Sequence, residues 1–322
     1  MSILIYAESS EGKFKKVAFE LASYGKKVAE SLGTTVTAVT MNASNVSELS
    51  KYGVDKVLKV TSEKLGAFNA KAYADVIKQA AQKEGTKLVL LSSTTDSLYL
   101  APLVAVGLNA GYASNVVGLP ISTSPFQVKR NAFSNKAFTV TEIATDVKVL
   151  GLAKNSYGIF ENAGSASEED FAPSLNDADF NIKTDSVDKT AGKLTIADAE
   201  VVVSGGRGLK GPENWGLIED LASALGAATA CSKPVSDLGW RPHSEHVGQT
   251  GKPVATNLYV AVGISGAIQH IAGINASKVK LVINADADAP FFKVADYGVV
   301  GDAFEIVPKL TEKIKEFKAN NA

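Results

Sequence analysis

Short apolar runs alternate with helically spaced apolar residues through the first hundred positions of the chain. Helical spacing from Phe14 to Leu32 and over residues 70–83 predicts two amphipathic helices. Another helix is predicted over residues 96–109, where Pro102 can be accommodated in the first turns. Runs typical of buried strands lie at residues 3–6, 35–39, 56–60 and 87–91. Strands that alternate with helices indicate βαβ units and a parallel sheet.

The pattern changes between residues 115 and 152. Three strand-like runs separated by short polar breaks lie at residues 126–130, 137–140 and 148–152. This spacing is typical of antiparallel strands, so we expect a meander appended to the first sheet. Residues 161–199 are rich in Ala, Ser, Asp and Lys with little apolar periodicity, which indicates a connection between domains.

A second α/β unit begins at Val201. Its predicted elements are a strand from Val201, a helix over 213–225, and strands at 258–262 and 280–283. A last helix is predicted around residues 309–318. The sequence leaves two possible starts for this helix, because Asp302 and Glu305 resemble a capping box whereas Pro308 favours a later beginning. We therefore expect an α/β protein of two domains, 1–188 and 189–322, each around a mainly parallel sheet flanked by helices.

Composition narrows the class of protein. The chain has 322 residues, and its 33 Lys and Arg nearly balance its 34 Asp and Glu. No basic block rises above scattered lysines, so we expect no nucleic-acid partner. Cys231 is the only cysteine, which excludes an internal disulfide and fits a reducing compartment. The N-terminus lacks a basic leader, and no window approaches the roughly 20 apolar residues of a membrane span, so we expect a soluble, cytoplasmic protein.

Glycine and small polar residues follow the predicted strands of the second domain. In an open α/β sheet, ligands bind at the carboxyl ends of the strands. The spacing Gly206-x-Gly208-x-x-Gly211 formally matches the dinucleotide fingerprint, but no acidic residue follows about 20 positions later to hold a ribose. A simple turn and another kind of phosphate site both remain open. Backbone amides beside Arg207 would suit a pyrophosphate.

The segment from Gly248 to Lys252 resembles a phosphate loop but lacks its spacing, which excludes a nucleoside triphosphatase. Gln249 and Thr250 would suit sugar hydroxyls or a heteroaromatic edge, and a polar hairpin tip is the alternative. His270 is one of three histidines, and it is either structural, exposed or at a ligand. The spacing of histidines and acids does not fit zinc, and without a G-x-S-x-G elbow a hydrolase is unsupported. Cys231 is expected in the core.

Four segments taken together resemble the α subunits of the electron transfer flavoproteins. They span residues 203–210, 247–252, 261–270 and 295–302 in the order and spacing of that family. The resemblance implies a nucleotide-hydrolase-like N-terminal domain with appended antiparallel strands, which packs with a β subunit. It also implies a doubly wound C-terminal domain that binds FAD, with AMP or a second FAD mainly in the β subunit.

The same resemblance implies the residues that hold FAD. Arg207 and Ser232 would lie at the pyrophosphate, the Thr250 hydroxyl near flavin N5 and His270 beside the O2 carbonyl. Asn284 and Asp302 would bind the adenosine end. The implied set is Arg207, Ser232, Lys233, Val247, Gly248, Gln249, Thr250, Ser265, Gly266, Ala267, Ile268, Gln269, His270, Asn284, Asp302 and Ala303.

Lys233 departs from the family pattern, which usually has arginine at this position. Lysine keeps the positive charge but lacks the planar guanidinium of arginine. Together with Thr250 and His270, Lys233 is expected to tune the flavin. The resemblance implies an electron carrier that accepts electrons from dehydrogenases, such as acyl-CoA dehydrogenases, and passes them to a membrane-bound quinone oxidoreductase. The alternatives are an NADH-oxidising bifurcating form, an NAD-dependent dehydrogenase and a nucleotide-binding sensor.

Overall fold

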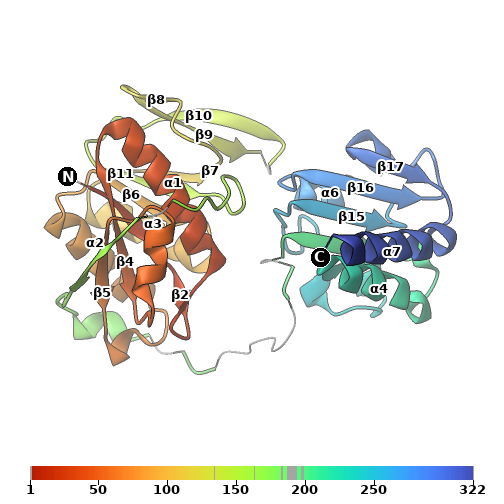
Figure 1. The fold of residues 1–322 in the computed structure, drawn as a ribbon, viewed down its shortest axis with the longest axis horizontal. Helices are drawn as coiled ribbons and strands as arrows, with labels where there is room; N and C mark the ends of the chain where they lie inside the picture. The colour runs from red at the N-terminus through yellow and green to blue at the C-terminus, as the bar shows by residue number, and fades with distance from the viewer. Residues whose placement is uncertain are drawn as a thin grey trace. The chain divides into compact units, whose positions relative to one another are not determined.

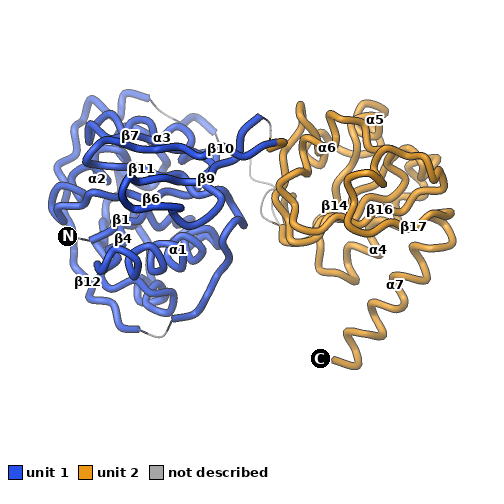
Figure 2. Tube along the Cα trace, turned by 90° about the horizontal axis from the view of Figure 1, so that it is seen from above, with its two compact units in different colours: residues 1–133, 137–187 blue, residues 134–136, 188–322 orange. Residues whose placement is uncertain are grey.

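The structure, a computed structural model, describes residues 2–133, 135–162, 164–182, 184–186, 194–196 and 199–321. These residues form two compact units, coloured separately in Figure 2. The first unit contains residues 2–133 and the described part of 137–186, and the second contains residues 135–136 and the described residues from 194 onward. Each unit is an α/β structure with its own sheet, as the sequence predicts.

The sheet of the first unit has a parallel centre and an antiparallel margin (Figure 1). Its parallel strands, in spatial order, are β12 (Ser167–Asp170), β5 (Lys56–Val60), β4 (Thr35–Met41), β1 (Ser2–Tyr6), β6 (Leu88–Ser92), β11 (Lys148–Leu152) and β7 (Gly111–Val116). Beyond β7 lie the antiparallel strands β9 (Phe126–Ala132), β10 (Ala137–Glu142) and β8 (Ser122–Thr123). A two-stranded hairpin, β2 (Ser9–Ser10) with β3 (Lys13–Phe14), follows β1.

Helices cover both faces of this sheet. On one face, α1 (Lys16–Leu32) buries Leu21 and Val28 against Ile3 and Ile5 of β1. On the other face, α2 (Ala70–Lys83) and α3 (Thr95–Gly107) pack against strand residues such as Leu4. Alternate residues of β1 therefore enter different cores, which explains why the strand is a continuous apolar run. Short 3-10 helices are η1 (Val46–Lys51), η2 (Glu63–Leu65) and η3 (Asp177–Phe180).

Two predictions for the first unit are wrong. Residues 148–152 were expected in the antiparallel meander, but β11 lies between β6 and β7 and is parallel to both. Its Val149 and Leu150 are buried in opposite cores, as required of a strand covered on both faces. The predicted interdomain connection also contains β12, which extends the sheet beside β5. Glu169 joins this polar strand to the sheet through ion pairs with Lys56 and Lys83, at 2.8 and 2.7 Å.

The sheet of the second unit is parallel throughout. Its strands, in spatial order, are β14 (Ala228–Cys231), β13 (Val201–Gly205), β15 (Leu258–Val262), β16 (Val279–Asn284) and β17 (Tyr297–Val300). One face packs against α4 (Gly216–Leu225) and α7 (Ala303–Asn320), and the other against α6 (Ile268–Ile274). The remaining helices are α5 (Lys233–Asp237), η4 (Arg207–Leu209), η5 (Pro212–Asn214), η6 (His243–Glu245) and η7 (Pro290–Lys293). The chain order reverses between β13 and β15, which makes their carboxyl ends a topological switch point.

The last helix begins earlier than the position of Pro308 suggested. Helix α7 starts at Ala303, and the Asp302 carboxylate caps it by accepting a hydrogen bond from Phe304 N at 2.9 Å. Pro308 lies inside the helix. The cap therefore fixes the start, and the earlier beginning indicated by Asp302 is confirmed.

Candidate functional site

The switch point of the second unit is built from two glycine loops pressed together. Gly206 N donates to Val262 O at 2.9 Å, and Gly208 N donates to Gly263 O at 3.1 Å. A side chain at Gly206 would overlap the carbonyl of Gly263, and a Cβ on Gly208 would lie 2.7 Å from Gly263 Cα. The glycines therefore allow the loops after β13 and β15 to share one narrow edge of the sheet.

The loop after β13 is not a standard dinucleotide turn. After Gly208 the chain makes a second 3-10 turn at Pro212–Asn214, and α4 begins only at Gly216. A side chain at Gly211 would meet the Glu213 carboxylate. An acid folded over the third glycine is unfavourable for a pyrophosphate at that point, so the geometry disfavours the NAD-dependent alternative.

Contacts with Phe291 and Asn284 fix the shape of the loop after β15. Gly266 has a φ of +88°, and a Cβ there would lie 2.5 Å from Phe291 N. Phe291 N donates to Ser265 O at 3.0 Å, and Asn284 Nδ2 donates to Ile264 O at 3.1 Å. Asn284 thus shapes the loop. The side chains of Ser265, Ala267, Ile268 and Gln269 are exposed at the sheet edge.

Residues 247–250 pack directly on α6. Gln249 N donates to Gln269 O at 2.8 Å, and a Cβ on Gly273 would lie 2.6 Å from Gly248 Cα. Val247 is fully buried, and its N–H donates to Cys231 O at 3.0 Å, so the segment also continues from the end of β14. The side chains of Gln249 and Thr250 remain exposed. The structure therefore brings the predicted segments 247–250 and 265–270 together.

His270 is buried behind this surface, 6% exposed, with its Nε2 2.9 Å from the hydroxyl of Tyr259. Its Nδ1 is buried and makes no hydrogen bond with any residue that the structure describes. Burial, with a smaller contribution from His246, lowers the pKa of His270 to about 4, while the Val247 carbonyl acts in the opposite direction. The imidazole is therefore neutral near pH 7.

The cationic side chains of the predicted set lie at the neighbouring strand ends. Arg207 is exposed on η4, directly after β13. Ser232 is buried and Lys233 exposed at the start of α5, directly after β14. Asp302 and Ala303 follow β17, at the opposite edge of the same sheet, where Asp302 caps α7. All these positions lie at carboxyl ends of parallel strands, which is the ligand-binding edge of such a sheet.

Cys231 is confirmed as a core residue. Its side chain is fully buried at the end of β14. Burial, followed by the nearby Glu245 carboxylate, raises the pKa of the thiol to about 12. A thiol in this state is not a nucleophile.

Three buried polar groups near the site were not predicted. Tyr259 lies in a run that reads as ordinary strand core, and its hydroxyl in an otherwise apolar run is the only signal. Ser204 Oγ and His246 Nδ1, like His270 Nδ1, are buried without a hydrogen-bond partner among the described residues. Burial and His243 lower the pKa of His246. Neutral, partly unsatisfied polar groups beneath exposed donors are typical of a ligand site.

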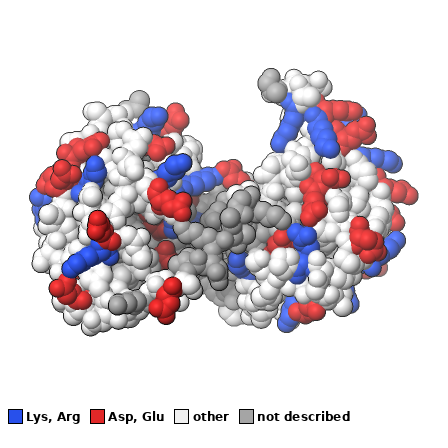
Figure 3. Space-filling model, turned by 90° about the horizontal axis from the view of Figure 1, so that it is seen from below, with Lys and Arg blue, Asp and Glu red and all other residues white. Residues whose placement is uncertain are grey.

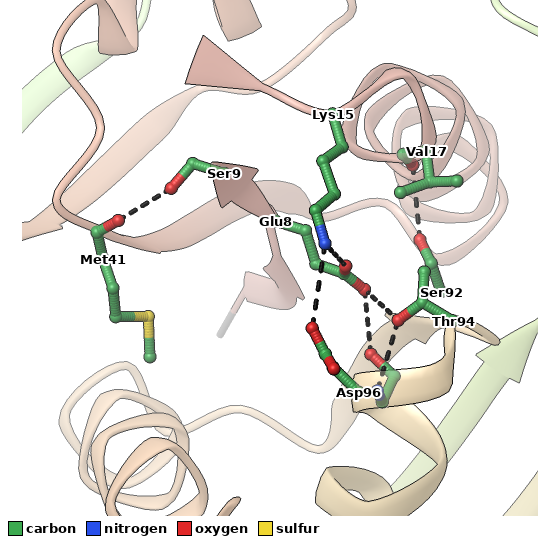
Figure 4. A network of polar contacts seen from close by, with 9 residues as sticks. Glu8, Ser9, Lys15, Val17, Met41, Ser92, Thr94 and Asp96 are labelled. Atoms are coloured by element: carbon green, nitrogen blue, oxygen red, sulfur yellow. Dashed lines mark hydrogen bonds and ion pairs between the residues drawn. The ribbon is translucent and has the colours of Figure 1, made fainter. Parts of the chain in front are cut away.

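The first unit has its own switch point, between β1 and β6 (Figure 4). Glu8, directly after β1, is 2% exposed there. Its Oε1 accepts hydrogen bonds from Thr94 Oγ1 at 2.6 Å and Ser97 Oγ at 2.9 Å, and Lys15 Nζ donates to Oε2 at 3.2 Å. The position where this fold would hold an anion is thus filled by the chain's own carboxylate. In the sequence, an acidic residue at the end of a buried strand could have indicated this network.

Surface charge, metal-ligating side chains and helix apolarity bear on other classes of site among the described residues. On the face shown in Figure 3, basic and acidic side chains are interspersed. Within the described ranges, three or more His, Cys, Asp or Glu side chains are nowhere grouped as a metal ion would require. Searched over the same part of the chain, helices lack the combination of length and apolarity needed to cross a membrane.

The fold is that of a doubly wound α/β protein, with glycine loops and exposed polar side chains at the switch point of its second unit. The family model described as the electron transfer flavoprotein domain matches residues 3–175. The model of the electron transfer flavoprotein FAD-binding domain matches residues 195–275. The chain belongs to the family of electron transfer flavoprotein α subunits, whose function is electron transfer.

Individual relatives cover almost the entire chain. Electron transfer flavoprotein subunit alpha of Bacillus subtilis strain 168 is 34% identical over 323 residues, 99% of each chain. The same subunit of Syntrophomonas wolfei subsp. wolfei is 36% identical over 315 residues, 97% of this chain and 98% of the relative. Protein FixB of Clostridium saccharobutylicum is 32% identical over 323 residues, 98% and 96% of the two chains.

Proposed function

We propose that this chain is the FAD-binding subunit of a heterodimeric electron carrier. It accepts electrons from dehydrogenases, such as acyl-CoA dehydrogenases, and passes them to a membrane-bound quinone oxidoreductase. The observation that carries the proposal is His270: a buried, neutral imidazole whose Nδ1 has no hydrogen-bond partner among the described residues. It directly follows Gln269, whose carbonyl accepts a hydrogen bond from Gln249 N. Such a group supports binding of an uncharged polar edge, as a flavin ring presents.

The residues at the strand ends fit the parts of FAD. The exposed guanidinium of Arg207 would bind the pyrophosphate, near the buried Ser232. Residues 247–250 would line the flavin ring and ribityl chain, with the Thr250 hydroxyl near N5. Residues 265–270 would hold the phosphates and the ring edge, and the first amides of α6, which have no intrahelical partner, are suited to phosphate. Asn284, Asp302 and Ala303 would lie toward the adenosine.

The chemistry belongs to the bound flavin, which supplies reversible electron transfer. The chain's residues bind and orient it and adjust its electronic environment. Lys233 supplies positive charge without the planar, stacking surface of arginine. Thr250 and His270 would supply hydrogen-bond donors. We infer that these three side chains set how readily the flavin is reduced.

The proposed partner is the β subunit of the same family, which would carry AMP or a second FAD. Helix α3 of the first unit supports a partner, because it is apolar around its circumference and leaves Leu98, Tyr99 and Val106 exposed, the last by 82%. Exposed apolar faces of this kind mark protein interfaces. We place the domain boundary between residues 188 and 189, with the first domain packing on the β subunit. We also propose that the carrier is cytoplasmic.

The test is anaerobic reductive titration of the chain purified with a co-expressed β subunit, followed by visible absorbance. One FAD per heterodimer, bleached by a reduced acyl-CoA dehydrogenase and re-oxidised by the quinone oxidoreductase, is the expected result. Two flavins that are reduced in separate steps by NADH would instead support the bifurcating form of the carrier. Bound nucleotide without reversible bleaching would indicate a sensor, and a preparation without flavin absorbance would overturn the FAD site.

A further inference from the structure

Tyr259 lies in the middle of β15, and its phenol group ends on the ring of His270. Its Oη is 2.9 Å from Nε2, and the two side chains are 0% and 6% exposed. The His270 ring also lies near Phe291, with ring centroids 6.2 Å apart. Because water does not reach either group, each hydrogen atom must find a protein or ligand acceptor.

Two arrangements of hydrogen atoms are compatible with the Tyr259–His270 distance. Either the phenol donates to Nε2 and the ring hydrogen is on Nδ1, or Nε2–H donates to the phenol oxygen. The second arrangement needs another acceptor for the phenol hydrogen. Ser204 lies nearby, but it lowers the Tyr259 pKa against the rise caused by burial, which is the effect of a hydroxyl that donates to the phenol oxygen and not of an acceptor. Its Oγ also lies outside hydrogen-bonding geometry with the described residues. Only the first arrangement satisfies the phenol.

The surroundings of Nδ1 agree with a hydrogen atom at that nitrogen. The Val247 carbonyl favours a proton on the His270 ring, although no described group makes a hydrogen bond to Nδ1. Because the pKa of His270 is lowered to about 4, the ring carries a single hydrogen near pH 7. Among the described residues Nδ1 has no partner in hydrogen-bonding geometry, so a hydrogen atom at this nitrogen is available to a ligand.

We propose that Tyr259 is a positioning residue, which holds neutral His270 in the Nδ1–H tautomer and so directs an N–H donor at a carbonyl oxygen of the bound ligand. The choice of ligand rests on the proposed FAD site, whereas the tautomer rests on the chain alone. A ring free to exchange tautomers would offer either a donor or a lone pair, and a lone pair would repel the carbonyl.

The first experiment reads the tautomer directly. The full chain is labelled with ¹⁵N-histidine, and long-range ¹H–¹⁵N correlations are recorded at pH 7.5 without FAD. With three histidines in the sequence, His270 is assigned by the spectrum of His270→Gln. The expected result is Nδ1–H in the wild type and a mixture of tautomers in Tyr259→Phe. Ser204→Ala, which leaves the Tyr259–His270 contact intact, is the matched control and should keep Nδ1–H.

Nε2–H in the wild-type spectrum overturns the proposal, whether or not Tyr259→Phe folds. The second experiment measures FAD affinity by equilibrium dialysis, where Tyr259→Phe should bind roughly five-fold more weakly than wild type. The control is Tyr112→Phe, which removes a hydroxyl group from β7 of the first unit and should bind within about two-fold of wild type. Equal affinity in wild type and Tyr259→Phe would overturn the role toward the ligand. Nδ1–H in a chain that binds no FAD would instead refute the proposed function and leave the tautomer assignment standing.

Discussion

At the scale of single residues, the candidate site depends on glycines, because they have no Cβ atom. Gly206 and Gly208 lie against the backbone of Gly263, and Gly273 lies against Gly248, so two pairs of segments approach more closely than any side chain would allow. Close packing of this kind does not relax around an added methyl group. The loops that surround the proposed ligand therefore have little freedom to accept substitution.

Gly206→Ala should destabilise the second unit by about 2 kcal/mol and abolish retention of FAD, because the new Cβ overlaps the Gly263 carbonyl. Gly216→Ala is the matched control, since no atom lies within 4 Å of its Cβ and α4 begins there. Urea unfolding and the ratio of visible to ultraviolet absorbance measure the two effects. Identical behaviour of the two variants would contradict the role assigned to the Gly206 contact.

His270 should make the stability of the second unit depend on pH. Its pKa in the folded chain is about 4, against an ordinary value of 6.5, so the unfolded chain binds the proton first. The free energy of unfolding should therefore fall as the pH is lowered from about 6.5 toward 4, by about 3 kcal/mol from this residue. The measurement is the difference between wild type and His270→Gln in urea unfolding at each pH. A difference that stays constant across this window would show that His270 titrates normally.

Residues differ in how far the sequence reveals them. Glycine and polar residues at 205–208 and 263–270 were predictable, because apolar runs that stop at glycine mark strand ends. Tyr259 was not, since a phenol in a strand looks like core packing until the position of His270 is known. Glu8 could be noticed as an acid at the end of a buried strand, but its partners Thr94 and Ser97 could not be predicted, because they lie more than 80 positions along the chain.

At the scale of elements, α3 of the first unit is tied to β1 by one buried carboxylate. Thr94, the N-cap of α3, accepts a hydrogen bond from Ser97 N at 3.2 Å and donates to Glu8. The helix start, the end of β6 and the end of β1 therefore share one network (Figure 4). Removal of the acid would leave several buried donors without an acceptor.

Glu8→Ala should lower the free energy of unfolding of the first unit by about 3 kcal/mol, because two hydroxyl groups and Lys15 lose their common acceptor. Glu8→Gln, which keeps an oxygen for the hydroxyls, should cost about half as much. Hydrogen exchange followed by mass spectrometry localises the effect to peptides from β1 and α3. Equal protection of these peptides in Glu8→Ala and wild type would contradict the prediction.

The order of elements was predictable more fully than their placement. Local periodicity identified most strands and the three helices of the first unit. It could not show that β11 inserts between β6 and β7, because this depends on pairing between residues 60 and 37 positions apart, such as Leu150 with Leu90 and with Ala113. β7 was missed, since Gly111, Ser114 and Asn115 weaken its apolar pattern. β12 was missed because ion pairs rather than apolar packing hold its Glu169.

At the scale of the molecule, each unit has its own hydrophobic cores. The two clusters of the first unit draw only on residues up to Phe180, and those of the second begin at Ile196. The sheet of the second unit is also complete, with five parallel strands contributed by residues 201–300. A unit with a complete sheet and its own cores meets the physical requirements for independent folding.

A fragment of residues 189–322 should therefore fold cooperatively by itself, because its sheet and cores need no residue of the first unit. Circular dichroism during urea unfolding measures this, with the fragment carrying Gly206→Ala as the destabilised comparison. A non-cooperative transition in the unsubstituted fragment would move the proposed boundary between the domains. If the fragment binds FAD, the second unit is sufficient for that binding.

The rate at which the buried Cys231 is modified should report how often the second sheet opens. With a pKa of about 12, only about one thiol in 10⁵ is ionised at pH 7, and the closed sheet shields that fraction from reagents. A disulfide reagent should thus modify the native protein only as fast as the second sheet opens, while it reacts within seconds in urea. Modification at the same speed in both states would show that the thiol is accessible. Because Cys231 is the sole cysteine in the sequence, every modified molecule registers one such opening and none registers the first unit.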